Sequence, residues 1–374
     1  MTGNVLDLPI SAHPDPDEFV RAAMEWHFGP ETGSAYWLRR AETLPFSPRA
    51  DVKSVEDLAL FPSIVDELRD VRVEDLIPRG YGPDLDIFGI YKSGGTTGAP
   101  KHLVLMRDWW DQHEAWTNAC LDAHGLPRNV NWLAVLPSGR PRQIGEVATQ
   151  AAAGRGGIKF SVYMDPRAVK KLIAAGQAEE AGAYADHLVQ HAAFLLHSQD
   201  IGVLVTTPPL LERITRRDDL VTLINEKVQA IVWGGTHMDA DTRRRYRTEV
   251  FPDVKVLGMF GSEMILGCMT ERVGGDGDDR CVFDPPAPFI TFRVVDPETG
   301  CTVRYGERGQ VVMNHVSKSM LLPGNLENDI ATRVEPSAGQ AGDSVADVYP
   351  VASFGGAEVD LGEFRMRTKA VVGG

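Results

Sequence analysis

Residues 91–101 read Tyr91-Lys92-Ser93-Gly94-Gly95-Thr96-Thr97-Gly98-Ala99-Pro100-Lys101. Glycines let the backbone approach a ligand without a Cβ in the way. Successive main-chain N–H groups in such a loop can line a concavity that favours anions. The hydroxyl side chains add donors, and the terminal lysine adds a positive charge. The stretch therefore predicts a polyphosphate-binding loop and a nucleotide triphosphate as ligand. The predicted binding residues here are Ser93, Gly94, Gly95, Thr96, Thr97, Gly98 and Lys101.

The loop has two other interpretations, a P-loop and a plain turn. The P-loop of nucleotide hydrolases requires G-x-x-x-x-G-K-[ST]. Counting from Gly94, the second glycine would fall on Ala99, and His102 follows Lys101 where a hydroxyl should hold magnesium. The P-loop pattern is therefore not met. A plain glycine-rich turn between two strands, at residues 86–91 and 101–106, remains the structural alternative.

Composition limits the classes of protein to consider. The chain has 374 residues, 43% of them hydrophobic, which is enough for a large core and two or three subdomains. The 52 acidic and 38 basic residues give a formal net charge of −14, which disfavours non-specific binding to nucleic acid or an anionic membrane. No apolar run approaches the roughly 20 residues of a membrane span, and the N-terminus lacks a signal-peptide pattern. We expect a cytoplasmic enzyme with no membrane and no nucleic-acid partner.

The order of apolar segments predicts an α/β fold. Short helices and proline-rich connections fill about the first 80 residues. From about 87 to 258, strand-like runs at 132–136, 158–163, 202–205, 230–233 and 254–258 alternate with helical segments that include 108–123, 179–196 and 239–250. Such alternation predicts mainly parallel sheets flanked by helices. Near residue 285 the pattern changes to a hairpin and further strands, which predicts a small β-rich subdomain.

Three later stretches also carry chemistry. Residues 231–239 place Gly234 and Gly235 at the carboxyl end of a strand, where parallel sheets usually bind ligands. Residues 258–263 read Gly-Met-Phe-Gly-Ser-Glu and end in Glu263, a carboxylate suited to Mg²⁺. Residues 295–331 contain D-P-E-T-G, G-E-R-G-Q-V and then Asp329. Each stretch also has a plain structural reading as a turn, a strand end or a solvated loop.

Together, in this order, the four stretches resemble the adenylate-forming superfamily, which contains acyl-CoA synthetases, peptide-synthetase adenylation domains and luciferases. Its phosphate loop is roughly [ST]-S-G-T-T-G-x-P-K, so Gly94 departs from it by one hydroxyl. Thr236 stands where the family has Glu after Gly-Gly. The Ser262-Glu263 pair is similar to that of the phenylacetate–CoA ligase branch. In the family, an Arg-Tyr pair precedes the ribose-binding aspartate. This chain lacks that pair and has Gly324 and Asn325 nearby instead.

The resemblance implies roles for single residues. Lys101 and Glu263 are the predicted catalytic residues, with Glu263 as the Mg²⁺ ligand. The resemblance places an aromatic ring against adenine, and Met259 and Phe260 compete for that role. Asp329 would accept hydrogen bonds from the ribose hydroxyls. The full set implied for ATP beyond the loop is Gly234, Gly235, Thr236, Phe260, Gly261, Ser262 and Asp329, and the set for the substrate is Arg140, Gly258 and Gly261.

The family normally continues into a small lid domain with a catalytic lysine. We expect this chain to comprise an adenylating body at 1–284, a β-rich subdomain at 285–335 and a short tail at 336–374 in place of the lid. The resemblance extends to short adenylating proteins of phenazine antibiotic clusters, such as that for D-alanylgriseoluteic acid. It implies a planar aromatic acid, such as a phenazine carboxylate, as substrate. A homodimer is one option for the assembly.

Three hypotheses about function follow. In the first, the chain adenylates an aromatic carboxylic acid with ATP and Mg²⁺ and passes the acyl-adenylate to a separate acceptor or reductase. In the second, it binds an aryl acid or acyl-adenylate without catalysis and acts with a partner enzyme. In the third, it is a conventional aryl-CoA ligase.

Overall fold

The structure is a computed structural model that describes residues 4–93, 100–136, 143–274 and 280–350. The chain divides into two compact units. Unit 1 contains residues 1–125, 140–143 and 259–348, and unit 2 contains residues 126–139, 144–258 and 349–374. The predicted α/β class is confirmed, because parallel strands flanked by helices occur together with antiparallel sheets.

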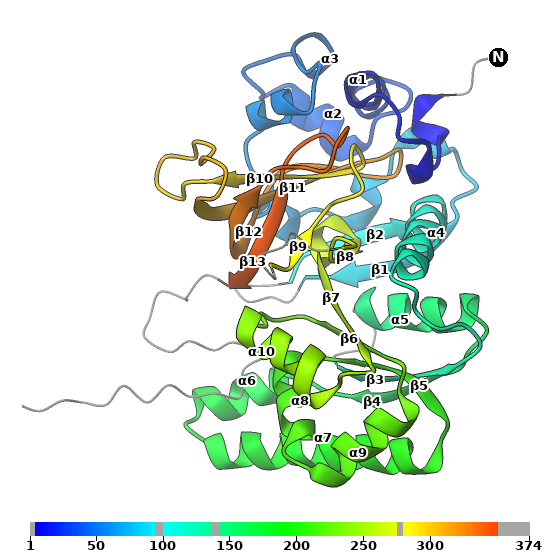
Figure 1. The fold of residues 1–374 in the computed structure, drawn as a ribbon. Helices are drawn as coiled ribbons and strands as arrows, with labels where there is room; N and C mark the ends of the chain where they lie inside the picture. The colour runs from blue at the N-terminus through cyan, green and yellow to red at the C-terminus, as the bar shows by residue number, and fades with distance from the viewer. Residues whose placement is uncertain (1–3, 94–99, 137–142, 275–279, 351–374) are drawn as a thin grey trace, which may run out of the picture. The chain divides into compact units, whose positions relative to one another are not determined.

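Unit 2 contains the predicted alternation of strands and helices (Figure 1). Its strands are β3 (Asn131–Leu136), β4 (Lys159–Tyr163), β5 (Ile201–Thr206) and β6 (Ala230–Gly234), and β7 (Lys255–Ser262) starts here. Its helices are α5 (Gln143–Gly154), α6 (Pro166–Ala174), α7 (Ala178–Ser198), α8 (Pro208–Thr215), α9 (Asp218–Lys227) and α10 (Ala240–Arg245). Strands β4, β3, β5 and β6 pair in parallel in that order. All six residues of β5 are buried, as expected for a strand covered on both faces.

Unit 1 holds the N-terminal helices and the antiparallel strands. Its helices are α1 (Pro16–His27), α2 (Ala35–Ala41), α3 (Pro48–Asp51) and α4 (Arg107–Ala123). Its strands are β1 (Ile87–Lys92), β2 (His102–Met106), β8 (Gly267–Thr270), β9 (Val282–Phe283), β10 (Ile290–Val295), β11 (Arg308–Val316), β12 (Leu321–Val334) and most of β13 (Ser344–Pro350). Strands β1 and β2 form a hairpin, and the larger sheet has the order β10-β11-β12-β13-β9.

Local backbone preferences define one helix end and one turn. Helix α4 ends at Ala123, and Gly125 has φ +63, a conformation that glycine adopts without strain. The hairpin after β10 turns at Asp296, whose Oδ1 accepts the N–H of Thr299 at 2.8 Å. Its second limb pairs with β10 through a bridge between Val295 and Thr302 and through the N–H of Val303, which donates to the Val294 carbonyl at 3.1 Å, but it does not form a full strand.

Two other boundaries differ from prediction. The predicted helix at 239–250 is α10 followed by a π-helical turn at Tyr246–Val250. Helices α5, α6, α8 and α9 lie in the stretches expected to be helical, but their bounds were not predicted, since alanine-rich or short apolar segments give weak periodicity. Strand β13 was also missed, and it lies in the same sheet as β12.

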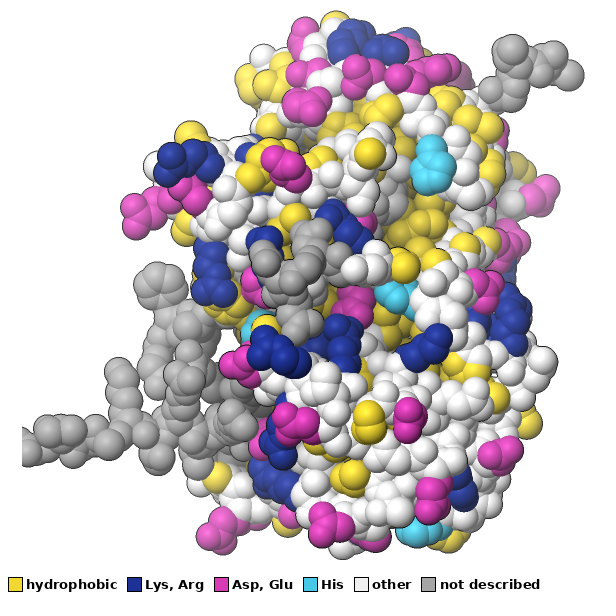
Figure 2. Space-filling view, in the orientation of Figure 1, with side chains coloured by type: hydrophobic (Ala, Val, Ile, Leu, Met, Phe, Trp, Pro, Cys, Tyr) yellow, Lys and Arg dark blue, Asp and Glu magenta, His cyan; other side chains and the backbone are white. Residues whose placement is uncertain are grey.

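On one face of the molecule, charged side chains of both signs are mixed (Figure 2). On the face shown in Figure 2, acidic side chains are scattered and basic side chains occur among them. No helix in the described part of the chain is long and apolar enough to cross a bilayer. Any attraction for a polyanionic ligand must therefore come from local geometry, because the formal net charge of −14 repels it.

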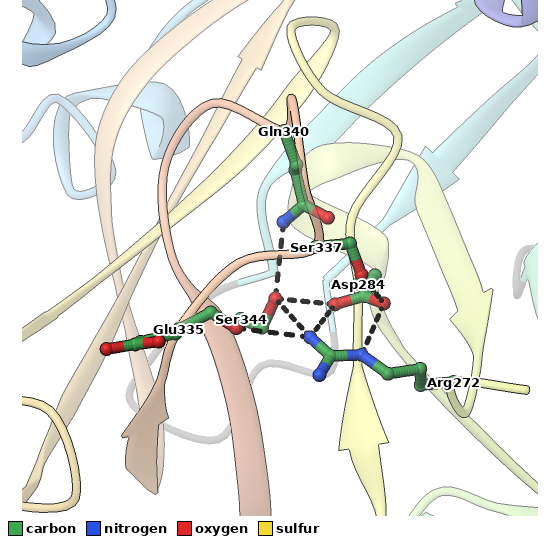
Figure 3. A network of polar contacts seen from close by, with 6 residues as sticks. All are labelled: Arg272, Asp284, Glu335, Ser337, Gln340 and Ser344. Atoms are coloured by element: carbon green, nitrogen blue, oxygen red, sulfur yellow. Dashed lines mark hydrogen bonds and ion pairs between the residues drawn. The ribbon is translucent and has the colours of Figure 1, made fainter. Parts of the chain in front are cut away.

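A polar network holds the ends of the larger sheet in unit 1 (Figure 3). Arg272 donates to both carboxylate oxygens of Asp284, at 2.9 and 2.8 Å. Asp284 also accepts hydrogen bonds from the hydroxyls of Ser337 and Ser344, and these donors together lower the pKa of its carboxyl against the effect of burial. The network ties β9 to the connection between β12 and β13, and so braces the strand that carries Asp329.

Candidate functional site

The base of the predicted phosphate loop is closed by hydrogen bonds. Strands β1 and β2 pair up to Lys92 and His102. Beyond them, Ser93 N–H donates to the Lys101 carbonyl at 3.0 Å, and Lys101 N–H donates to Ser93 Oγ at 3.1 Å. The predicted flanking strands are confirmed within one residue at each end. Gly94, Gly95, Thr96, Thr97 and Gly98 lie outside the described residues.

Lys101 lies among charged groups in a buried position. The residue is 7% exposed. Burial and the neighbouring Arg69 lower the pKa of its ammonium, while the charges of Asp66 and Glu327 act in the opposite direction. Arg69 itself pairs with Asp66 at 3.0 Å. Lys101 is thus a cation in the field of one basic and two acidic side chains.

The third motif, residues 258–263, forms the end of β7 and the start of a short 3-10 helix. Within it, Gly261 pairs with Cys268 of β8, and a Cβ on Gly261 would lie 2.4 Å from the Gly267 carbonyl oxygen. Only glycine fits there without a shift. Ser262 Oγ accepts the N–H of Met264 at 3.1 Å and thereby caps the 3-10 helix Glu263–Ile265.

Phe260 and Met259, the two candidates for the adenine-facing side chain, are both half-buried. The ring of Phe260 packs against Phe283 at 5.4 Å and Phe292 at 6.0 Å between centroids. Consecutive residues of a strand point to opposite faces. Met259 therefore faces away from these rings, and which of the two meets adenine stays a prediction.

Glu263 follows Ser262 directly and is half-buried. Its carboxylate is a hard oxygen donor of the kind that Mg²⁺ prefers, and Mg²⁺ is commonly held by one or two carboxylates together with substrate phosphates. The described residues include no cluster of three or more metal-ligating side chains. A single carboxylate beside the predicted phosphate site would fit that mode of Mg²⁺ binding.

The end of the fourth motif, which contains Asp329, lies on β12, where the pairing of the strand is irregular. Val312 pairs with Leu326 and Gln310 with Ile330, so Val311 faces three residues, Glu327 to Asp329, instead of one. Such a bulge re-aims side chains and is common near ligand sites. Asp329 therefore lies in a distorted strand, half-buried, and not in a loop.

Sequence reasoning missed two residues beside these positions. Asn325, 1% exposed, donates from Nδ2 to Glu327 Oε1 at 2.6 Å. Glu327 is also hydrogen-bonded to Ser262, and burial raises the pKa of its carboxyl. No local pattern marks Glu327, because it is one acidic residue in a half-polar strand. The one hint in the sequence is that residues 324–325 lack the Arg-Tyr pair of the family that the motifs resemble.

The remaining predicted residues belong to unit 2 or lie outside the described residues. Gly234 ends β6, and Gly235 has φ +82, which a residue with a side chain would adopt only under strain. Thr236 follows, with its hydroxyl 3.5 Å from the His237 carbonyl oxygen. Gly258 is buried in β7. Arg140 is outside the described residues.

Comparison with solved structures gives the fold. A crystal structure of 2-hydroxyisobutyryl-CoA ligase in complex with 2-HIB-AMP and CoA matches 91% of this chain and 69% of its own, with a TM-score of 0.63 and 17% identity. A second, of the same ligase in the postadenylation state with R3-HIB-AMP, matches 89% of this chain and 67% of its own, with a TM-score of 0.62 and 16% identity. This chain therefore has the fold of about two thirds of that ligase. No protein-family model and no curated protein matches the sequence.

With this fold, unit 1 alone brings together residues from three of the four motifs. Glu327 in the β12 bulge hydrogen-bonds to Ser262, and its charge acts on Lys101. A hydroxyl, an ammonium and a carboxylate group thus interact within unit 1.

Proposed function

We propose that this chain is an ATP-dependent enzyme that adenylates an aromatic carboxylic acid. A carboxylate oxygen of the acid attacks the α-phosphorus of ATP, the bond from that phosphorus to the bridging oxygen breaks, and pyrophosphate leaves. The observation that carries the proposal is the meeting of Lys101, Ser262 and the β12 bulge in one unit. The neighbouring ligase structures with acyl-AMP bound support it.

The proposed roles follow from the chemistry of each group. Lys101 offsets negative charge on the phosphates, and charge aimed at a developing transition state is usually the largest catalytic contribution. The Ser262 hydroxyl donates to a phosphate oxygen, and Asp329 accepts hydrogen bonds from ribose. Glu263 would hold Mg²⁺, which when bound neutralises phosphate charge. Gly234 and Gly235 let the backbone approach the nucleotide, and Arg140 binds a carboxylate of the substrate.

We further propose a planar substrate such as a phenazine carboxylate, with a separate acceptor or reductase that takes the acyl-adenylate in antibiotic biosynthesis. The resemblance of the motifs to short phenazine-cluster adenylating proteins supports this. A cytoplasmic location and a homodimer stay predictions.

The test is ATP–pyrophosphate exchange with Mg²⁺ and a panel of acids: benzoate, phenylacetate, phenazine-1-carboxylate and phenazine-1,6-dicarboxylate. We expect exchange that depends on the acid, with a phenazine acid preferred. Lys101→Met should lower the rate on the order of 10²-fold, the usual loss for one electrostatic donor. Lys159→Met is the matched control, because Lys159 is another lysine with a pKa lowered by burial, in unit 2.

The alternatives give different results. Absence of exchange with every acid, together with calorimetric binding of ATP and an acid, would identify a non-catalytic binding protein. Formation of a thioester when CoA is added to the purified chain would identify a conventional CoA ligase. Exchange without thioester formation supports the proposed transfer to a separate acceptor.

A further inference from the structure

Glu327 is a half-buried acid that interacts with two predicted phosphate-binding groups. Its carboxyl is hydrogen-bonded to Ser262 and lies in the field of Lys101. Asn325 donates to its Oε1 at 2.6 Å, and Gln310 donates to its backbone carbonyl at 2.7 Å. The side chain is therefore held in place from the strand bulge and from the neighbouring strand β11.

The hydroxyl of Ser262 has one proton and two lone pairs. One lone pair accepts the N–H of Met264 at 3.1 Å. If Glu327 is ionised, it can only accept, so Ser262 must give its single proton to Glu327 and can face a phosphate only as an acceptor. If Glu327 is protonated, it can donate to the second lone pair, and the proton of Ser262 is released for a phosphate oxygen.

The charged groups around Glu327 also affect its protonation. Burial raises the pKa of its carboxyl, while the hydrogen bonds from Ser262 and Asn325 and the charge of Lys101 oppose that rise. Behind Lys101 lies the pair of Arg69 and Asp66. A polyphosphate that draws the charge of Lys101 to itself removes this stabilisation of the ionised form and adds negative charge nearby. Both changes favour the protonated form of Glu327.

We propose that Glu327 is a positioning residue that becomes protonated when nucleotide binds and then turns the hydroxyl of Ser262 toward the phosphate. This inference rests on the proposed function of the site. It adds a specific consequence, since nucleotide binding takes up about one proton from solution at neutral pH. It also gives a reason for the bulge in β12 and for the buried amide of Asn325, which position an acid beside a proposed site for a polyanion.

The test measures binding of Mg²⁺ and a non-hydrolysable ATP analogue by calorimetry, in buffers of different ionisation enthalpy, from pH 6.5 to 8.5. Excess Mg²⁺ keeps the terminal phosphate deprotonated over this range, so the ligand itself does not titrate. For the unmodified chain we expect a heat that depends on the buffer and an affinity that falls by up to tenfold per pH unit. Glu327→Gln keeps a neutral donor toward Ser262, so its affinity should not change with pH and should equal or exceed the unmodified value at pH 8.

Three controls separate the explanations. Glu307→Gln removes another carboxylate of the same unit, paired with Arg304, and should behave as the unmodified chain. Ser262→Ala should abolish the advantage of Glu327→Gln at pH 8, because the acceptor is gone. Circular dichroism checks that each variant is folded.

The outcomes are distinct. If the unmodified chain and Glu327→Gln bind nucleotide with the same pH dependence and the same proton uptake, the inference is wrong while the nucleotide site stands. If the folded, unmodified chain binds no nucleotide, both the inference and the proposed function are overturned.

Discussion

Three buried histidines in unit 1 should make the protein unstable in mild acid. His27, His113 and His315 are 1%, 1% and 0% exposed, and burial lowers their pKa values to about 4, 4 and 3. His315 Nδ1–H donates to the Ile265 carbonyl at 2.6 Å, so its Nε2, 2.7 Å from Ser317 Oγ, acts as an acceptor. The neutral ring is thus satisfied on both sides, and the folded protein has no place for a second proton there.

The direction of this pH dependence follows from the linkage between proton binding and folding. The unfolded chain binds a proton at each histidine below about pH 6.5, whereas the folded chain does not, so stability is full above that pH and falls as the pH falls toward 4. Between pH 7.5 and 5.5 each histidine costs about 1.3 kcal/mol of unfolding free energy, and the three together cost about 4 kcal/mol. That loss is a large part of the 5–15 kcal/mol that stabilises a typical protein.

The assay is urea unfolding at several pH values, followed by tryptophan fluorescence, since Trp109 lies 4.4 Å from His315 between ring centroids. His315→Asn keeps a donor for the Ile265 carbonyl but cannot be protonated. Its unfolding free energy should fall by about 1.3 kcal/mol less than that of the unmodified chain between pH 7.5 and 5.5. His187→Asn, at an exposed position on α7, should leave the pH dependence unchanged. An identical pH dependence for His315→Asn and the unmodified chain would refute the reasoning, because His315 would then be titrating alike in both states.

Three further predictions concern single residues. Gly261→Ala should lower stability by about 1–3 kcal/mol, seen as a lower melting temperature, because its Cβ would overlap the Gly267 carbonyl oxygen; an unchanged melting temperature would mean that the strands can separate. Asp284→Ala should cost about 1–3 kcal/mol, measured by urea unfolding, because Arg272 loses its partner, while Asp284→Asn should cost less; equal losses would argue against the ion pair. Asp329→Ala should raise the dissociation constant of ATP about tenfold in calorimetry without changing the melting temperature; an unchanged constant would remove it from the ribose site.

Local features of this protein are set by the sequence alone. The glycines and hydroxyls of residues 93–101 lie between two apolar segments close together in the sequence, so their two strands were predicted within one residue. Alternating strands and helices between 87 and 258 predicted the parallel sheet, because such periodicity depends on neighbours along the chain. The aspartate turn after β10 and the glycine after α4 follow from local backbone preferences.

Only the tertiary structure decided which of these pieces form a site. Glu327 meets Ser262 across 65 residues of sequence, and that contact depends on a two-residue register shift between β11 and β12. Such a shift arises from packing between strands, and no pattern within β12 encodes it. The same holds for Lys101, whose charge the sequence shows but whose burial beside Arg69, Asp66 and Glu327 comes from long-range packing. The chain's chemical groups are therefore readable from its sequence, whereas their protonation and orientation depend on the folded environment.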